Sequence, residues 1–105
     1  MKSLKLFESL KTMIYTANIR ADGKIINQKG TGVEVTKKEN GRYIISYKKL
    51  NLPQMPFVQV TSYNYSSSAR LEGLPSRDEC NVVCVTQMFG REFYYDTCFC
   101  ITITF

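Results

Sequence analysis

The chain has 105 residues and a formal net charge of +5, and 44% of its residues are hydrophobic. This length fits one domain, and the apolar content argues against a disordered chain. No apolar stretch approaches the ~20 residues that a membrane-spanning helix needs, and the N-terminal sequence MKSLKLFESLK lacks the apolar centre of a signal peptide. We therefore expect a protein that is synthesised in the cytoplasm without a signal peptide and does not insert into a membrane.

The chain divides into an N-terminal segment, residues 1–12, and a domain spanning residues 13–105. In the first segment Leu4, Phe7 and Leu10 fall roughly on one helical face, which predicts a short helical or extended segment. Residues 13–19 are rich in strand-forming side chains, and Ala21-Asp22-Gly23 predicts a turn.

Residues 30–63 contain the clearest local signal. Residues 32–37 and 42–48 alternate between apolar and polar side chains on either side of Asn40-Gly41. Asn-Gly between two alternating runs predicts a β-hairpin, because both residues tolerate positive φ. The prolines at 53 and 56 exclude a central strand there, and residues 57–65 form the next predicted strand.

The C-terminal part is predicted to hold a loop and two strands. Residues 66–79 contain Ser-Ser-Ser, Gly73 and Pro75 and are predicted to be an irregular loop. Residues 80–89 are apolar on both faces, as in a central strand. Residues 93–105 alternate throughout and are predicted to be one final strand. About seven short strands separated by turns indicate an all-β fold, an antiparallel β-sandwich.

The order of these motifs resembles the small β-sandwich domains at the tips of phage tail fibres and in H-type lectin-like modules. The resemblance covers roughly residues 17–105. It rests on NIRADG at 18–23, GTGVEV at 30–35, GRYII at 41–45, PFVQVT at 56–61 and DTCFCI at 96–101. The four cysteines are not typical of those modules. The resemblance implies a homotrimer, a component of a virion, that presents loops to a cell-surface receptor or carbohydrate.

The residues also suggest self-association. Cys80, Val82, Cys84 and Met88 form a second apolar row, and Cys98 and Cys100 lie opposite the expected core face of the last strand. A two-layer domain needs only one apolar face per sheet. We therefore expect a homotrimer whose interface includes Met88 or the surroundings of Cys98 and Cys100. Cover by the N-terminal segment is the alternative.

The candidate ligand site is the predicted loop 66–79 with the strand before it. A loop of this length in a compact domain is usually functional or mobile. Tyrosines offer a stacking surface and the loop offers charges of both signs. The predicted ligand-binding residues are Tyr63, Tyr65, Arg70, Glu72, Arg77 and Asp78.

Catalysis is not expected, and neither is a cofactor. The chain contains no His, so it lacks Ser-His and Cys-His pairs. Paired cysteines on extended strands lie ~7–13 Å apart, too far for one metal ion to bind both. Three interpretations of the cysteines remain: reduced and buried, disulfide-bonded, or metal-binding.

Two other functions remain open. The basic excess lies in residues 1–49, around the first hairpin, at Lys37, Lys38, Arg42, Lys48 and Lys49. A small basic β-barrel that binds nucleic acid would use such residues, although a nucleic-acid partner is not expected from seven strands. A structural assembly protein without a ligand is the other alternative.

Overall fold

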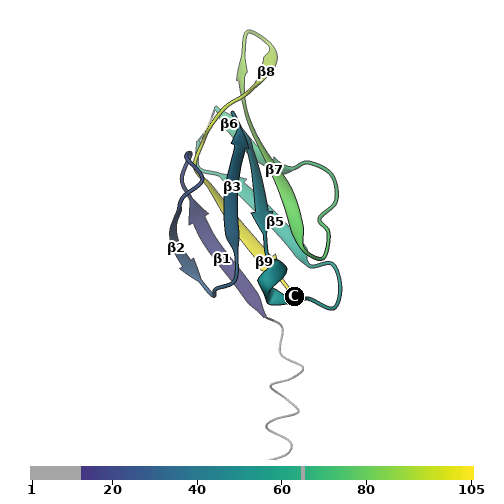
Figure 1. Cartoon of the computed structure of the whole chain (residues 1–105). Coiled ribbons are helices and arrows are strands. Elements are labelled where there is room, and N and C mark those ends of the chain that lie inside the picture. Colours follow the sequence, from purple (N-terminus) through teal and green to yellow (C-terminus); the bar gives the residue numbers. More distant parts are fainter. Residues whose placement is uncertain (1–12, 65) are drawn as a thin grey trace, which may run out of the picture.

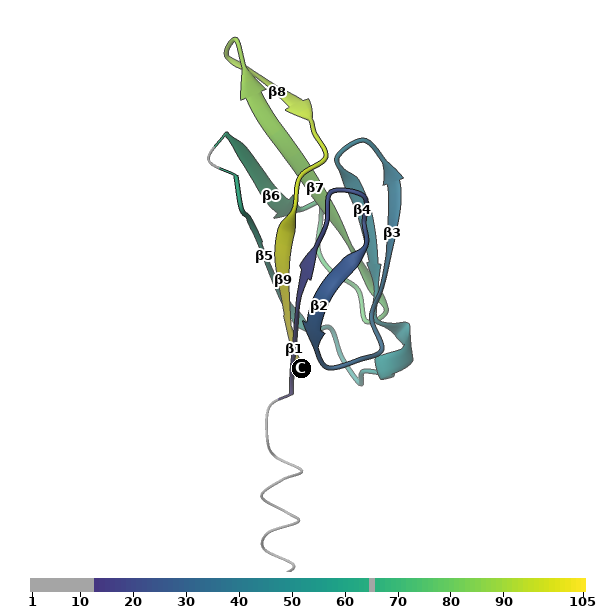
Figure 2. The same cartoon turned by 90° about the vertical axis from the view of Figure 1, so that its left-hand side faces the viewer.

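The computed structural model describes residues 13–64 and 66–105, which form two antiparallel β-sheets packed face to face (Figures 1 and 2). The predicted all-β sandwich is confirmed, with nine strands in these residues rather than about seven. The N-terminal segment predicted for residues 1–12 lies outside the described residues.

Sheet A has four strands in the order β2-β1-β9-β5. They are β1 (Ile14–Ile19), β2 (Ile25–Lys29), β5 (Phe57–Ser62) and β9 (Phe99–Thr104). Strand β9 lies between β1 and β5, so Ile101 is opposite Ala17 on one side and Val60 on the other. The strand with the strongest alternation is therefore paired along both of its edges.

Sheet B has the order β3-β4-β7-β6, with β8 also paired to β7. Its strands are β3 (Glu34–Glu39), β4 (Arg42–Ser46), β6 (Ser67–Leu71), β7 (Glu79–Met88) and β8 (Arg91–Tyr94). The long strand β7 pairs with β4 along its first half and with β8 along its last four residues. The β7–β8 hairpin consequently protrudes beyond the rest of the sandwich (Figure 1).

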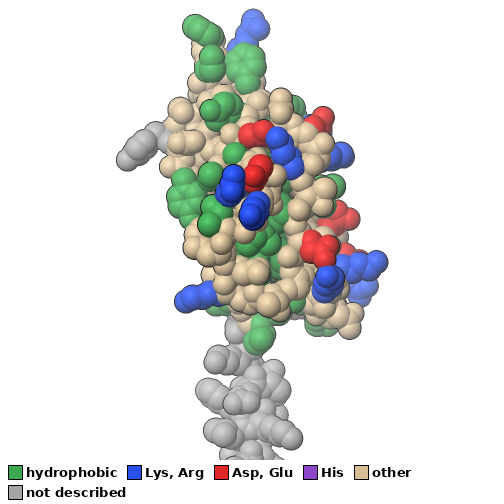
Figure 3. All heavy atoms as spheres, turned by 60° about the vertical axis from the view of Figure 1, so that its left-hand side comes forward, with side chains coloured by type: hydrophobic (Ala, Val, Ile, Leu, Met, Phe, Trp, Pro, Cys, Tyr) green, Lys and Arg blue, Asp and Glu red, His purple; other side chains and the backbone are tan. Residues whose placement is uncertain are grey.

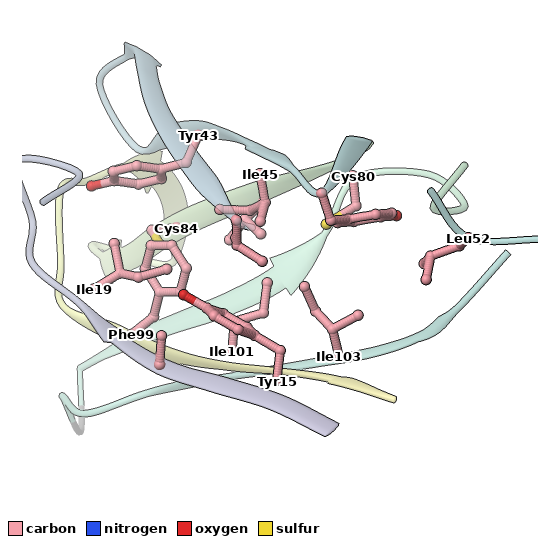
Figure 4. Packing of buried hydrophobic residues seen from close by; sticks show 14 residues of the cluster. Tyr15, Ile19, Tyr43, Ile45, Leu52, Cys80, Cys84, Phe99, Ile101 and Ile103 are labelled. Carbon is pink, nitrogen blue, oxygen red and sulfur yellow. The ribbon is translucent and has the colours of Figure 1, made fainter. Parts of the chain in front are cut away.

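The core lies between the two sheets (Figure 4). Tyr15, Ile19, Phe99, Ile101 and Ile103 come from sheet A, and Tyr43, Ile45, Cys80, Val82 and Cys84 come from sheet B. All of these side chains are almost completely buried. Burying one large apolar side chain contributes about 1.5–3 kcal/mol to stability, so this cluster is the main source of the fold's stability.

The buried tyrosines keep their hydroxyl groups hydrogen-bonded. The Tyr43 hydroxyl donates to the carbonyl of Ala21 at 2.7 Å, and the Tyr47 hydroxyl donates to the carbonyl of Ser76 at 2.6 Å. The Tyr43 ring also meets the Phe99 ring edge-on across the core, with centroids 5.1 Å apart. These contacts place polar atoms in the core without leaving them unsatisfied.

The prediction that residues 93–105 form one final strand is wrong. Strands β8 and β9 belong to different sheets, and the chain crosses from sheet B to sheet A between Tyr94 and Phe99. The alternation continues through the crossing because Thr97 is also buried. Phe93 and Tyr95, which the alternation places on the inward face, are exposed, because periodicity cannot show that the chain changes sheets.

The predicted loop at residues 66–79 is also wrong in part. Strand β6 occupies its first half and pairs with β7, with Ala69 opposite Cys84. Serine and arginine are not strong strand formers, so the partner strand β7, rather than local propensity, explains this element. Within this range, Ser66 and the connection from residue 72 to residue 78 lie outside strands.

Candidate functional site

The outer face of sheet A is a flat surface of mainly amide and hydroxyl groups, with the exposed Ile14 and Phe57 at one end. Strand β1 places Tyr15, Ala17 and Ile19 in the core, so the residues between them point outward. The polar members of this face are Thr16, Asn18, Asn27, Gln59, Thr61, Thr102 and Thr104. Lys29 of β2 is the one charged side chain among its described members.

A row of hydrogen bonds crosses this face from β5 to β2. The Tyr63 hydroxyl donates to Oδ1 of Asn18, and Nδ2 of Asn18 donates to Oδ1 of Asn27 at 2.7 Å. Tyr63 follows the end of β5, and its side chain reaches over Cys100 of β9 to β1. The row fixes the orientation of both amides, and each amide keeps hydrogen-bonding capacity that the row does not use.

Tyr63 itself combines an exposed aromatic ring with a hydroxyl held in place. Its side chain is 61% exposed. Desolvation over the sheet raises the pKa of Tyr63, and the Cys100 thiol beside it adds to the effect. The phenol is therefore neutral at physiological pH and remains a hydrogen-bond donor. Between β1 and β2 a depression of about 360 Å³ adjoins the row, lined by Thr16, Ala17, Asn18, Asn27, Gln28 and Lys29.

The structure separates the residues that the sequence suggested as one site. Arg70 lies on β6 and forms an ion pair with Glu92 of β8 at 3.0 Å, and Glu72 pairs with Arg42 of β4 at 3.3 Å. These pairs lie on the outer face of sheet B, the opposite side of the sandwich from Tyr63. Tyr65 lies outside the described residues.

Arg77 and Asp78 lie in the turn before β7. The backbone carbonyl of Asp78 accepts a hydrogen bond from the Tyr47 backbone N–H at 2.8 Å. The backbone N–H of Asp78 donates to the Ser76 hydroxyl at 3.2 Å. These contacts shape the turn rather than a ligand site. Tyr63 is thus the only described member of the predicted set on the amide-rich face.

Asn18 and Asn27 were not among the predicted site residues. Asn18 lies in the first alternating run, between inward-facing Ala17 and Ile19, so its outward direction could have been inferred. Its distance from Tyr63 could not, because 45 residues separate the two in the sequence. The pairing of β1 and β5 with the same strand, β9, brings them together.

The second apolar row expected on residues 80–88 is wrong as a surface feature. Cys80, Val82 and Cys84 belong to the core cluster. The opposite row holds Val83 and Val85, which are also buried, because larger side chains of the neighbouring strands cover them. This removes one physical reason for self-association but does not test it.

The cover over these valines is formed by charged and aromatic side chains. Arg42 is opposite Val83, and Tyr94 is opposite Val85. The Arg42 guanidinium lies 4.7 Å from the centre of the Tyr94 ring and donates to its hydroxyl at 2.7 Å. It also pairs with Glu39 at 3.1 Å. The arrangement covers the outer face of sheet B with paired groups, and among the described residues Nε of Arg42 is buried there without a hydrogen-bond partner.

Three of the five basic residues named around the first hairpin, Lys37, Arg42 and Lys49, pair with neighbouring carboxylates, whereas Lys38 and Lys48 form no ion pair with described residues. Lys37 pairs with Asp96, and Lys49 pairs with Glu34, both at 2.5 Å. Figure 3 shows Lys and Arg side chains intermixed with Asp and Glu on one face of the molecule. A continuous track of free cations, which a nucleic-acid groove requires, is not formed on that face.

The thiols fall into two classes. All four cysteines are free; Cys80 and Cys84 are buried, and Cys98 and Cys100 are half-buried. Burial raises the pKa of the Cys80 and Cys84 thiols to about 12. No group of three or more acidic or cysteine side chains among residues 13–64 and 66–105 is placed to hold a metal ion.

No helix in the described part of the chain is long and apolar enough to cross a membrane.

Similarity to other proteins does not identify the function of this surface. Comparison with protein-family models, with curated proteins and with solved structures finds no match to this chain.

Proposed function

We propose that this protein is a non-enzymatic binding module that recognises a neutral carbohydrate of a cell-surface receptor and acts as a homotrimer. The observation that carries the proposal is the hydrogen-bonded row Tyr63–Asn18–Asn27 across the outer face of sheet A. This replaces the loop 66–79 as the proposed site, while Tyr63 keeps its proposed role as a stacking surface.

The chemistry of the face suits a sugar. A sugar ring offers an apolar face and several hydroxyl groups that both donate and accept hydrogen bonds. The exposed Tyr63 ring supplies an apolar surface with a polar edge, and asparagine amides and threonine hydroxyls supply donors and acceptors in turn. The near absence of charge favours a neutral glycan over an anionic one.

The same geometry makes a nucleic-acid ligand the weaker alternative. Binding to phosphates depends on free lysine and arginine side chains. Lys37, Arg42 and Lys49 are engaged by carboxylates, and the face around Tyr63 contributes only Lys29. Binding to single-stranded DNA that disappears with added salt would favour this alternative.

A flat, open face gives weak binding per site. A homotrimer presents three copies of the face, and linked sites raise the overall affinity without new contacts. The structure also limits where a trimer interface could lie, because the Tyr63 side chain already reaches over Cys100. The proposed carbohydrate face and an interface centred on Cys100 would compete for the same surface.

The test is a glycan array probed with the full chain and with single variants. Tyr63→Ala should weaken binding to any glycan that the protein recognises by at least about tenfold, which corresponds to about 1.4 kcal/mol. Tyr63→Phe keeps the ring but releases Asn18, so it should cause a smaller loss. Leu74→Ala is the control, since this exposed side chain lies in the connection from β6 to β7.

The outcome decides between the proposed functions. If the protein binds no glycan, or if Tyr63→Ala binds as well as the control, the carbohydrate proposal fails. Circular dichroism of each variant, compared with the unmodified protein, separates loss of binding from loss of fold.

A further inference from the structure

The β7–β8 hairpin ends in an exposed apolar tip. Phe89 is 93% exposed, and its neighbours Met88 and Phe93 are half-exposed. Figure 3 shows hydrophobic side chains gathered at the end of this protrusion. A cluster of exposed apolar side chains on a projecting element is typical of a contact surface.

The backbone of the turn makes phenylalanine an unfavourable choice at this position. Phe89 and Gly90 have φ values of 53° and 73°. Two-residue hairpin turns with two positive φ values favour Asn-Gly, because a β-carbon strains the left-handed conformation. The chain therefore places a large apolar side chain where asparagine would fit better and be more soluble.

The hairpin is braced against the sandwich. Arg70 of β6 makes two contacts to the Glu92 carboxylate, at 3.0 and 3.3 Å, and Arg42 of β4 holds Tyr94. At the base of the hairpin, the Tyr95 backbone N–H donates to the Cys84 carbonyl at 3.0 Å. These contacts fix the direction of the tip before any contact is made, which lowers the entropy cost of binding.

The opposite end of the molecule carries an apolar pocket. Pro53, Met55, Phe57 and Phe105 line it, together with Gln54 and Thr104, and its volume is about 290 Å³. Phe57 is 78% exposed at its rim. Pockets for drug-sized ligands span about 300–1,000 Å³, so this one suits one or two side chains. The end of β9 that forms it and the hairpin lie at opposite ends of the molecule (Figures 1 and 2).

We infer that the hairpin tip of one copy inserts into this pocket of a second copy, so that the chains associate head to tail. The same chain presents both a rigid apolar projection and an apolar pocket of side-chain size. Burial of Phe89 would remove from water the most exposed aromatic side chain among the described residues. Because the two surfaces lie at opposite ends, the contact does not close on itself, and such heterologous contacts produce open rows of molecules.

The pocket adjoins the outer face of sheet A, because Thr104 belongs to both, but Tyr63 and Asn18 lie toward the other end of the strands, near Cys100. A row of copies, or of trimers with parallel long axes, would present many such faces in one array. The contact surface is small, so it should be weak and depend on concentration.

The experiment uses four forms of the full chain: unmodified, Phe89→Asn, Phe57→Asp and Leu74→Ser. Phe89→Asn removes the apolar tip while supplying the residue that this turn prefers, so the fold is retained. Phe57→Asp places a charge at the rim of the pocket, at a side chain that is exposed in the free molecule. Leu74→Ser removes an equally exposed apolar side chain from a different surface.

Sedimentation velocity from about 10 μM to about 1 mM, a range suited to weak contacts, measures the average mass. The unmodified protein and Leu74→Ser should both increase in average mass with concentration, and each of the other two variants alone should not. An equimolar mixture of Phe89→Asn and Phe57→Asp should form pairs of units that do not grow further, since the mixture contains one working tip and one working pocket.

Three results would overturn the inference: an unmodified protein whose mass is constant over this range, a Phe89→Asn variant that associates like the unmodified protein, or a mixture that does not pair. A constant mass of three chains would overturn the head-to-tail contact and leave the homotrimer and the carbohydrate proposal standing.

Discussion

The backbone N–H of Gly41 donates a 2.7 Å hydrogen bond to the carboxylate of Asp96. This bond joins the β3–β4 turn to the segment through which the chain crosses from sheet B to sheet A. The Lys37 ammonium group pairs with the same carboxylate. A β-carbon at position 41 would lie 2.4 Å from the Cys84 carbonyl oxygen and 2.7 Å from the Tyr95 nitrogen. The turn and the crossing therefore fit together only while residue 41 is glycine.

Replacing this glycine should be strongly destabilising. Gly41→Ala places a β-carbon in a left-handed backbone conformation, which costs about 1–2 kcal/mol. The clash of this β-carbon with the backbone costs about 1–3 kcal/mol more, the range found for overpacked cores. We expect a loss of about 3 kcal/mol in the free energy of urea unfolding. Gly73→Ala is the matched control: its φ of 80° is also left-handed, but nothing lies within 4 Å of its added β-carbon. Equal losses in the two variants would show that strain alone, without the clash, explains the effect.

The Asp96 carboxylate should make stability depend on pH. Burial alone would raise the pKa of Asp96, but hydrogen bonds from Lys37 and the Gly41 amide outweigh it and hold the pKa below its usual value. A carboxylate with a lowered folded-state pKa stabilises the fold above about pH 4 and loses that contribution as the pH falls through the folded-state pKa.

Asp96→Asn keeps an acceptor for Gly41 and removes the charge. We expect a loss of about 1–2 kcal/mol at pH 7, and the difference from the unmodified protein should shrink as the pH falls below about 4 and through the lowered folded-state pKa of Asp96. Urea unfolding over a series of pH values from neutral to acidic measures this. Asp22→Asn, whose ion pair with Arg20 is exposed, should show little effect, and a pH-independent loss in Asp96→Asn would contradict the assignment.

The four thiols should react in two groups. Cys80 and Cys84 are buried with pKa values raised to about 12, so they hold no reactive thiolate at neutral pH. Cys98 and Cys100 are half-buried and should be modified by an alkylating reagent in the folded protein. Peptide mass spectrometry of native and urea-unfolded samples locates the labels. Rapid native labelling of Cys84 would show that the core opens locally.

The homotrimer remains a prediction for solution measurement. Sedimentation equilibrium at micromolar concentration should give the mass of three chains. Met88→Asp should dissociate the trimer if the interface includes the hairpin, because a buried, unpaired charge costs several kcal/mol. Ser68→Asp, on strand β6 of the body, is the control. A stable monomer before any substitution would rule the trimer out.

Local sequence patterns were sufficient to predict several strands and turns of the fold. The Asn40-Gly41 turn predicted the hairpin that became β3 and β4, and the alternation of residues 99–104 predicted which side chains of β9 are buried. These features depend on backbone conformations and on the two-residue period of a strand. Both are properties of neighbouring residues, so they can be read without knowing the partner strands.

Tertiary structure decided the elements that depend on distant partners. Strand β6 exists because β7 offers it a paired edge, and the run from Phe93 to Phe105 divides because Asp96 is held by the β3–β4 turn. The same is true of the candidate site: Tyr63 and Asn18 meet because β5 and β1 both pair with β9. Within β9 the sequence determined which side chains face outward, whereas the order of strands in each sheet determined which outward side chains are neighbours, because pairing between distant strands leaves no periodic signal in the chain.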